Sequence, residues 1–416
     1  MSKSRFTRRL RPTSNLPALL TPTEASVAIE ASLSPLPIET CSIADAAGRI
    51  LREDLWAERD QPPFDRVAMD GIAIATHALY ASHGAFRIAG TVAAGARPLT
   101  LIDPSTCLEV MTGAVLPPGA DAVIPVENIT VKDGIAQVDG ALKVPAWDNV
   151  HRQASDALQG SLALRSGLRL RGPELAAAAS TGKSSLQVTV KPRIAVISTG
   201  DELIRPGLAL EPWQIRRSNT YGILACLHTH GYPILTDDHI GDQPDGLRER
   251  LATHLATHTV LILSGGVSAG RFDHVPAALE SIGVRKIFHK VAQRPGKPLW
   301  FGVGPQGQAV FALPGNPVST LVCLVRYVLP ALSYLSGEQV LPQRWAPLQD
   351  SFSARHDLTA FIPIERSADS THAGAVCLHP THGSGDFSSL INTLGFAELI
   401  PQQRYQPGDA VAVYTW

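Results

Sequence analysis

The stretch "RIAVISTGDEL" at residues 193–203 begins as a short apolar, partly β-branched run and ends in small and acidic residues. A helical pattern with a Ser/Asn start follows it, and the alternation of strand and helix continues to about residue 337. Strands that alternate with helices at this spacing predict a doubly wound, mostly parallel sheet covered on both faces. We therefore expect a central α/β domain at 191–337.

The segments on either side of this domain have different patterns. Short β-like runs separated by Gly, Pro and Asp turns predict an inserted β-rich domain at 58–149, and similar runs predict a C-terminal β-barrel at 338–416. Alanine-rich helical patterns at 16–57 and 150–190 bracket the inserted domain, which predicts a segmented, elongated helical domain built from both sides. We expect the basic tail at 1–15 to be flexible.

Composition and charge exclude several classes of protein. The chain has 416 residues, 44% of them hydrophobic and 18% charged, which fits a folded protein with more than one core. A formal net charge of -1 provides no overall field that would attract nucleic acid or a membrane. We see no apolar run near the roughly 18 residues needed to cross a bilayer. The 5 cysteines are far apart and lack zinc-site spacing, so we expect a reduced, cytoplasmic protein.

Three loops follow strands of the α/β domain, and each combines small residues with a helix start. They are "STGDEL" at 198–203, "SGGVSAGRFDH" at 264–274 and "LPGNPVST" at 313–320. In such a sheet, ligands bind beyond the carboxyl ends of the strands, where backbone N–H groups and helix N-termini hold anions. The alternative is that each loop only turns the chain and caps a helix, and for 198–203 taken alone capping is favoured.

The loop at 264–274 differs from the common phosphate-binding motifs. Arg271 and Phe272 stand where the lysine and Ser/Thr of a P-loop would be, and no dinucleotide-binding glycine pattern lies near. A nest of backbone N–H groups can hold an oxyanion without a lysine, and Asp273 could anchor a metal or accept from a pterin-type N–H donor.

Positive charge is available in a neighbouring turn, within "KVAQRPGKPLWFG" at 290–302. Lys290, Arg294 and Lys297 surround its Pro-Gly step, and a basic cluster beside anion-binding loops favours a substrate with phosphates or an oxyanion. A solvated charged surface is the alternative for these three side chains.

Three segments of the β-rich region also place charged or hydroxyl side chains near turns. They are "PPFDRVAMDGIAI" at 62–74, "MTGAVLPPGADAVIPVEN" at 111–128 and "NVHRQASDALQG" at 149–160. Without context, Asp70 and the glycine after it indicate only a hairpin turn.

Taken together, these motifs resemble, in the same order, those of the MoeA-type molybdopterin molybdenumtransferases, the family to which the C-terminal part of gephyrin also belongs. The resemblance covers about 16–416 and implies an elongated homodimer with four domains, of which the α/β domain binds molybdopterin. It implies active sites shared between the α/β domain of one subunit and the β-rich domain of its partner. The reaction implied takes adenylylated molybdopterin and molybdate, uses a divalent metal such as Mg²⁺, releases AMP and forms the molybdenum cofactor. A molybdoenzyme or an adenylyltransferase is the further partner implied.

The resemblance also implies roles for individual residues at matching motif positions. The catalytic residues would be Asp70, Asp156, Glu202, Lys290 and Arg294. The metal ligands would be Asp201, Glu202, Asp242 and Asp273. The substrate would be held by Thr112, Ser198, Thr199, Gly200, Ser264, Gly265, Gly266, Ser268, Asp273, Lys297, Pro314, Gly315, Asn316, Pro317 and Ser384.

The chain departs from the family pattern at several charged positions. Arg66 replaces an asparagine, Arg217 an aspartate and Arg294 a lysine, Arg271 stands where an acid is common, and "HRQASD" keeps one arginine and one acid. A second hypothesis is therefore a diverged, non-catalytic molybdopterin-binding or cofactor-delivery protein. A third, the adenylyl transfer that precedes insertion, is disfavoured because proteins of that kind have only the α/β domain.

Overall fold

The computed structural model describes residues 19–140, 143–267, 274–354, 357–367 and 374–416. The chain divides into two compact units. One contains the chain up to Glu39 together with Thr189–Trp416, and the other is Thr40–Val188. The predicted residues Ser268, Arg271 and Asp273 lie outside the described residues.

The first unit is built on a six-stranded sheet with the order β16-β13-β17-β21-β20-β18. The first four strands of this order pair in parallel and the last two antiparallel, which agrees with the mostly parallel sheet predicted from the sequence. The strands are β13 (Ile194–Thr199), β16 (Leu235–Ile240), β17 (Val260–Ser264), β18 (Arg285–His289), β20 (Trp300–Val303) and β21 (Ala309–Leu313).

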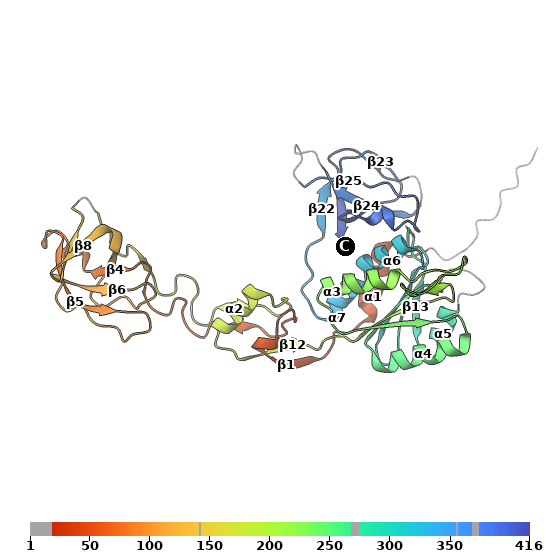
Figure 1. The fold of residues 1–416 in the computed structure, drawn as a ribbon, viewed down its shortest axis with the longest axis horizontal. Helices are drawn as coiled ribbons and strands as arrows, with labels where there is room; N and C mark the ends of the chain where they lie inside the picture. Colours follow the sequence, from red (N-terminus) through yellow and green to blue (C-terminus); the bar gives the residue numbers. More distant parts are fainter. Residues whose placement is uncertain (1–18, 141–142, 268–273, 355–356, 368–373) are drawn as a thin grey trace, which may run out of the picture. The chain divides into compact units, whose positions relative to one another are not determined.

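Helices cover both faces of this sheet (Figure 1). Ile194 and Val196 belong to a core with α1, α3 and the helix at 317–335, whereas Ala195 and Ile197 belong to a core with α4 and α5. This alternation along β13 is the period of two that places successive side chains on opposite faces of a sheet. The helices are α1 (Pro22–Ser32), α3 (Asn219–Thr229), α4 (Pro244–Thr257), α5 (Val275–Ser281), α6 (Pro317–Cys323) and α7 (Leu329–Leu335), and a π-helical segment, Leu324–Val328, joins the last two.

Helix α1 lies with the α/β core, although the sequence analysis assigned 16–57 to the segmented domain. Thr21 and Glu24 form a capping box at its start, and Ala25 and Ile29 are buried in the core. The backbone N–H of Ala292 donates to the carbonyl of Leu20 over 2.7 Å, which ties the segment before α1 to the α/β domain.

The helix at Pro317–Leu335 corrects one expectation from the sequence. It is 19 residues long with a mean hydropathy of 1.6, which is long and apolar enough to cross a membrane by length and composition. In the structure 78% of this window is buried inside the protein, and its residues pack in the larger core of the α/β unit. The helix therefore belongs to the core of this unit. Its sequence does not stand out as an apolar run because Arg326 and several hydroxyl residues interrupt it.

The C-terminal part of this unit forms a second sheet with the order β19-β24-β26-β28-β22, and β25 pairs with β24. Its first strand comes from the α/β domain, because Gln293 and Arg294 pair in parallel with Thr359 and Ala360. The pairings run from β19 to β22, and closure into the expected barrel stays a prediction. The strands are β19 (Gln293–Arg294), β22 (Arg344–Pro347), β24 (Thr359–Arg366), β25 (Val376–Leu378), β26 (Gly395–Leu399) and β28 (Ala410–Thr415).

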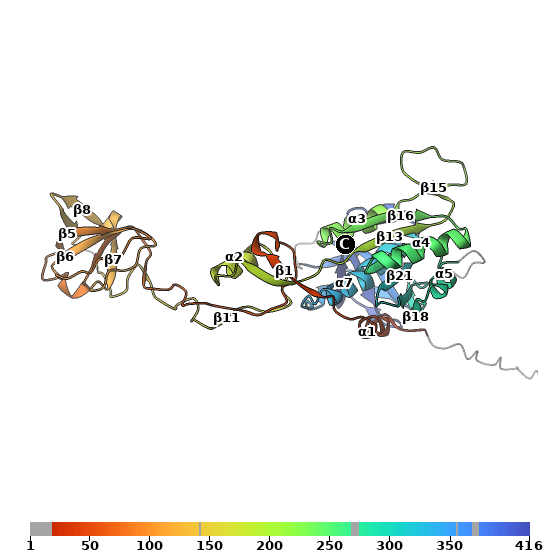
Figure 2. The ribbon, with the colours of Figure 1, turned by 90° about the horizontal axis from the view of Figure 1, so that it is seen from below.

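One loop leaves the α/β sheet between β14 (Leu203–Ile204) and β15 (Ile215–Arg216), two short strands that pair in parallel. Figure 2 shows the backbone around β15 running out from the sheet before it returns to α3. The loop thus separates Glu202, which lies between β13 and β14, from the helix that follows.

The second unit contains a six-stranded sheet with the order β7-β4-β6-β5-β9-β8 and a buried core on each of its faces. A smaller core forms where the chain enters and leaves this region, because β2 (Leu55–Trp56) pairs with β11 (Leu162–Leu164) beside α2 (Gly172–Ser180). The strands of the large sheet are β4 (Gly71–Ile74), β5 (Ala85–Val92), β6 (Thr106–Val110), β7 (Ala122–Pro125), β8 (Ile129–Lys132) and β9 (Ile135–Val138).

Candidate active site

A cavity of about 1040 Å³ opens where the loops after β13, β17 and β21 meet the turn at 293–298 and the C-terminal sheet. Twelve of the residues predicted from the sequence line it, which places the three glycine-containing loops around one space. These are Thr199, Gly200, Glu202, Asp242, Gly265, Gly266, Arg294, Lys297, Pro314, Gly315, Asn316 and Ser384.

The glycines after β17 allow two loops to approach each other closely. Gly265 and Gly266 have φ values of +105° and +67°. A Cβ on Gly265 would lie 2.8 Å from the carbonyl oxygen of Thr199, and one on Gly266 would lie 2.6 Å from the side chain of Val275. Only glycine combines this conformation with this space, so the loop presents bare backbone to the cavity.

Asn219, which the sequence analysis treated only as part of a helix start, holds two of these loops together. Its Nδ2 donates to Ser264 Oγ at 2.9 Å, to the Gly315 carbonyl at 2.8 Å and to Thr320 Oγ1 at 3.1 Å. Within the described part of the chain, Asn219 Oδ1 and Thr199 Oγ1 are buried with no hydrogen-bond partner. The sequence around Asn219 carries no signal of this role, because a Ser-Asn pair at this position is typical of a helix start.

We expect Asn219→Ala to lower the free energy of unfolding of this unit by about 2 kcal/mol, because the substitution removes a side-chain amide whose two protons are shared among Ser264, the Gly315 carbonyl and Thr320. Chemical denaturation followed by circular dichroism would measure the change. Thr229→Ala on the same helix is the control, because its hydroxyl bonds only the Ala225 carbonyl. Equal stability of the two variants would contradict a loop-joining role for Asn219.

Acidic side chains gather on one side of the cavity. The backbone N–H of Asp201 donates to Asp242 Oδ2 and that of Asp242 to Asp201 Oδ1, both over 3.2 Å. Glu202 and Asp242 line the cavity, whereas Asp201 does not. Among the described residues no group of three His, Cys, Asp or Glu side chains could hold a metal. Two carboxylates beside a phosphate site still fit Mg²⁺, which proteins usually hold through one or two carboxylates plus substrate oxygens.

The cationic side of the cavity comes from the turn at 293–298. Arg294 and Lys297 are exposed and line the cavity, whereas Lys290 does not. The Arg294–Pro295 peptide bond in this turn is cis. Opposite the turn, Asn316 Nδ2 donates to Ser384 Oγ at 2.8 Å, so the loop after β21 is bound to the C-terminal domain.

Three predicted substrate-binding residues lie next to the cavity and do not line it. The hydroxyls of Ser198 and Ser264 are used within the protein, the first against His239 Nδ1 at 3.0 Å and the second by Asn219. Pro317 is the first residue of α6. Their side chains therefore shape the loops around the cavity. The sequence pattern does not distinguish such a residue from one that contacts a ligand directly.

The remaining predicted residues, Asp70, Thr112 and Asp156, lie in the second unit, where they take part in two separate interactions. Thr112 donates to Asp70 Oδ1 through its hydroxyl at 2.7 Å and its backbone N–H at 2.6 Å. These two hydrogen bonds hold the pKa of Asp70 below its ordinary value, so the carboxylate is charged at neutral pH. The sequence alone suggested a plain hairpin turn here.

Asp156 takes part in a second interaction within this unit, where β3 (Arg66–Val67) pairs with β10 (Val150–His151). Arg66 Nη2 contacts His151 Nδ1 at 2.9 Å, and His151 Nε2 contacts Asp156 Oδ1 at 2.8 Å. Because arginine only donates hydrogen bonds, His151 Nδ1 is the acceptor from Arg66. The proton of the ring is then on Nε2, which donates a hydrogen bond to Asp156. Arg66, one of the departures from the family pattern, is thus linked to Asp156 through His151.

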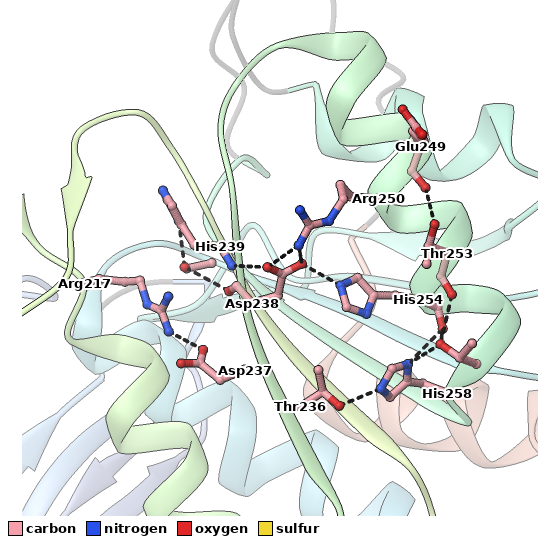
Figure 3. Close-up of polar contacts among 12 residues, drawn as sticks. Arg217, Thr236, Asp237, Asp238, His239, Glu249, Arg250, Thr253, His254 and His258 are labelled. Carbon is pink, nitrogen blue, oxygen red and sulfur yellow. Dashed lines mark hydrogen bonds and ion pairs between the residues drawn. The ribbon is translucent and has the colours of Figure 1, made fainter.

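Arg217, a second departure, is not among the residues that line the cavity. It forms an ion pair with Asp237 on β16 and is only 8% exposed (Figure 3). It does not line the cavity, so the change from an acid at this position is balanced by Asp237. Asp238, the next residue, faces α4 instead and binds Arg250 Nη2 and His254 Nε2 at 2.6 Å each.

The Asp238 network predicts a loss of stability in acid. Burial alone would raise the pKa of Asp238, but hydrogen bonds from His254, Arg250 and the His239 N–H outweigh it, so this pKa lies below its ordinary value of 3.8. The pKa of Asp238 is lower in the folded protein than in the unfolded chain. The carboxylate therefore stabilises the fold at pH values above its unfolded pKa, and this stabilisation is lost as the pH falls through its folded pKa.

We therefore expect the wild-type free energy of unfolding to fall more steeply below about pH 4 than that of Asp238→Asn, which should be less stable at pH 7 by about 2 kcal/mol. Urea denaturation at a series of pH values would measure this. Asp245→Asn is the control, because Asp245 has a 95% exposed side chain on α4, the helix that supplies Arg250 and His254 to Asp238. Parallel stability profiles for Asp238→Asn and the wild type would contradict the prediction.

Comparison with known proteins extends these observations. Residues 20–182 match the family described as "MoeA N-terminal region (domain I and II)", and residues 195–334 match "Probable molybdopterin binding domain". A molybdopterin molybdenumtransferase of Synechocystis is 37% identical over 91% of this chain and 95% of its own, and one of Synechococcus elongatus is 35% identical over 90% and 94%. The crystal structure of the molybdopterin biosynthesis moeA protein of Pyrococcus horikoshii aligns with a TM-score of 0.78 and 26% identity, over 96% of this chain and 100% of that one.

The fold and the cavity define a multidomain α/β and β-rich protein with a cavity at the carboxyl ends of a mostly parallel sheet. Identity above 30% over nine-tenths of the chain is sufficient to assign a family. The chain belongs to the molybdopterin molybdenumtransferase family.

Proposed function

We propose that this protein is a transferase of molybdenum cofactor biosynthesis that takes adenylylated molybdopterin and molybdate and releases AMP. The observation that carries the proposal is the single cavity in which bare backbone loops, two cations and two carboxylates come together. Molybdate is a dianion and the other substrate carries phosphates, so the ligand requires this combination of donors and charges. Membership of the family supports the same activity.

Each part of the cavity has a role in this proposal. The glycine loops after β13 and β17 cradle the phosphate and pterin end of the substrate, with Thr199, Gly200, Gly265 and Gly266 as the contact positions. Arg294 and Lys297 attract molybdate toward Ser384 and the loop at 313–317, where Pro314, Gly315 and Asn316 shape its site. Lys290 and Pro317 would act through the position of these two segments.

Glu202 and Asp242 are the residues that would hold Mg²⁺, and Asp201 and Asp273 are the further carboxylates proposed for it. A bound ion would neutralise charge on the phosphoanhydride. Glu202 would also help to orient the substrate for attack, since it follows β13 after two residues and lines the cavity.

The second unit would complete the site in a homodimer. Asp70, Thr112 and Asp156 of one subunit would face the cavity of its partner, and the negative charge of the two aspartates would orient N–H groups of the bound substrate. We further propose the four-domain division with a C-terminal barrel, a cytoplasmic location, and transfer of the product to a molybdoenzyme after receipt from an adenylyltransferase.

The test is incubation of the full-length protein with adenylylated molybdopterin, molybdate and Mg²⁺, with AMP measured over time. Molybdate-dependent AMP release is expected. Absence of any such release would contradict the proposal, and a requirement for ATP would favour adenylyl transfer instead. The link from Arg66 through His151 to Asp156 favours one alternative, a protein that binds molybdopterin without turnover. Tight equilibrium binding with no AMP release would support that alternative.

A further inference from the structure

A buried polar group lies directly beneath the cationic turn at 293–298. Gln293 is 0% exposed, and its side-chain oxygen accepts a hydrogen bond from the hydroxyl of Tyr327, itself 1% exposed. Gln293 Nε2 donates to the Pro295 carbonyl at 3.1 Å and to Cys323 Sγ at 3.6 Å. None of these contacts involves a group with a role in the proposed chemistry. They satisfy the buried amide of Gln293, which would be costly to bury without hydrogen-bond partners.

The helix that supplies Tyr327 and Cys323 is irregular at this point. Both residues come from the helix at Pro317–Leu335, and Tyr327 lies in its π-helical segment, Leu324–Val328. π-Helical turns are rare and are found frequently at functional sites. Residues four positions apart share one face of a helix, so Cys323 and Tyr327 both reach the turn.

The turn packs against these side chains without free space. Gly296 has a φ of +91°, and a Cβ placed there would lie 2.6 Å from Gln293 Nε2 and 2.7 Å from Cys323 Sγ. The Cys323 thiol also approaches the Gly296 carbonyl at 3.7 Å. Any displacement of the turn toward the core is therefore blocked, and a displacement away from it would break the hydrogen bonds that Gln293 forms with Tyr327 and Cys323 of the helix.

We propose that Tyr327 and Gln293 are positioning residues that hold the turn at 293–298 so that Arg294 and Lys297 face the anion in the cavity. The two cations are exposed, and the turn beneath them is fixed by a group that water cannot reach. The inference rests on the proposed function for the identity of the anion, molybdate, and on the structure for the mechanism of positioning.

Burial also keeps the supporting groups neutral. It raises the pKa of the Tyr327 phenol and of the Cys323 thiol well above their ordinary values, so both keep their protons at neutral pH. Positioning by this network is therefore expected to be independent of pH between pH 6 and pH 9, in contrast to a role in proton transfer.

The experiment compares Tyr327→Phe, Gln293→Met and the double variant in the full-length protein. Each single substitution should weaken equilibrium binding of molybdate by roughly tenfold, because the turn loses a buried hydrogen bond and the cations lose their fixed geometry. The KM for molybdate should rise by a similar factor, while kcat at saturating molybdate changes by less than roughly threefold. The double variant should bind molybdate with roughly the affinity of the weaker-binding single variant, because the two side chains act as one unit.

Tyr414→Phe is the matched control. It also removes a phenol hydroxyl bound within the core of this unit, to Glu398 Oε2 at 2.7 Å, and makes no contact with the turn. Its molybdate affinity should equal that of the wild type. Thermal unfolding of every variant, followed by circular dichroism, shows which of them are folded at the assay temperature.

Three results would overturn the positioning role. They are unchanged molybdate binding in both folded single variants, equal weakening by Tyr414→Phe, and a wild-type protein that does not bind molybdate at all. Wild-type binding that depends on Tyr327 without any AMP release would instead overturn the proposed transferase activity and leave the positioning role supported.

Discussion

Replacing Glu202 by glutamine is expected to lower the rate of molybdate-dependent AMP release by roughly 100-fold or more, because the variant loses a negative charge at the centre of the reaction. Glu202 is exposed to the cavity and packs against the backbone of Gly200, where a Cβ would lie 2.3 Å from its Oε2. Glutamine keeps this shape and removes the charge. Stability should therefore change by no more than about 0.5 kcal/mol.

Steady-state rates across a range of Mg²⁺ concentrations would measure the effect. A metal-holding role predicts that excess Mg²⁺ restores part of the lost rate, whereas a role confined to orienting phosphate predicts no such recovery. Glu211→Gln is the control, since Glu211 is an exposed carboxylate in the loop between β14 and β15 and does not line the cavity. If Glu202→Gln releases AMP at the wild-type rate, Glu202 has no part in the chemistry.

Replacing Lys297 by methionine is expected to raise the KM for molybdate by roughly 10- to 100-fold, the effect of losing a charge-assisted hydrogen bond of about 1.5–3 kcal/mol. The side chain is exposed and lines the cavity, so methionine replaces it without disturbing a core. The effect should be larger at low ionic strength, because salt screens the attraction between Lys297 and the dianion.

Isothermal titration of molybdate at two salt concentrations would measure this affinity directly. Lys286→Met is the matched control, because it removes the same charge from the same domain, where Lys286 pairs with Glu280 at 3.0 Å and does not line the cavity. Comparable loss of affinity in both variants would show that the overall charge of the protein matters and that the position of Lys297 does not.

The sequence allowed the α/β sheet and the position of its site to be predicted because both depend on local patterns. Strand and helix periods differ, and glycine loops follow the strands, so the carboxyl edge of the sheet could be located from residues 193–320 alone. The association of Glu202, Arg294 and Ser384 around one cavity followed from the order of their motifs.

Other features could not be predicted because they depend on contacts between distant segments. Asn219 looked like part of a helix start, and nothing in its neighbours shows that it reaches Ser264 and Gly315. Gln293 and Tyr327 are 34 positions apart, and each resembles an ordinary core or turn residue. Helix α1 was assigned to the wrong side of its boundary, since its apolar pattern does not identify the core that receives it.

The substitutions at charged positions were visible in the sequence, but their consequences were not. Arg217 had appeared to change the charge of the site, and the structure places its partner, Asp237, on the edge strand β16. Arg66 contacts His151 because strand β3 pairs with strand β10. Each of these strands is only two residues long, so the sequence gives no signal that they pair.

The pairing of β19 with β24 makes the cationic turn a shared property of two domains. Gln293 and Arg294 belong to the α/β domain by chain order and to the C-terminal sheet by hydrogen bonding, and the Thr359 N–H donates to the Ala292 carbonyl at 3.0 Å. A protein shortened after residue 337 would keep Glu202 and Asp242 and still lose the wall of the cavity that β24 provides through Ala360–Pro363. Because β24 both lines the cavity and pairs with the turn that carries Arg294, a substitution along this strand is expected to change the shape of the cavity and the position of that turn together.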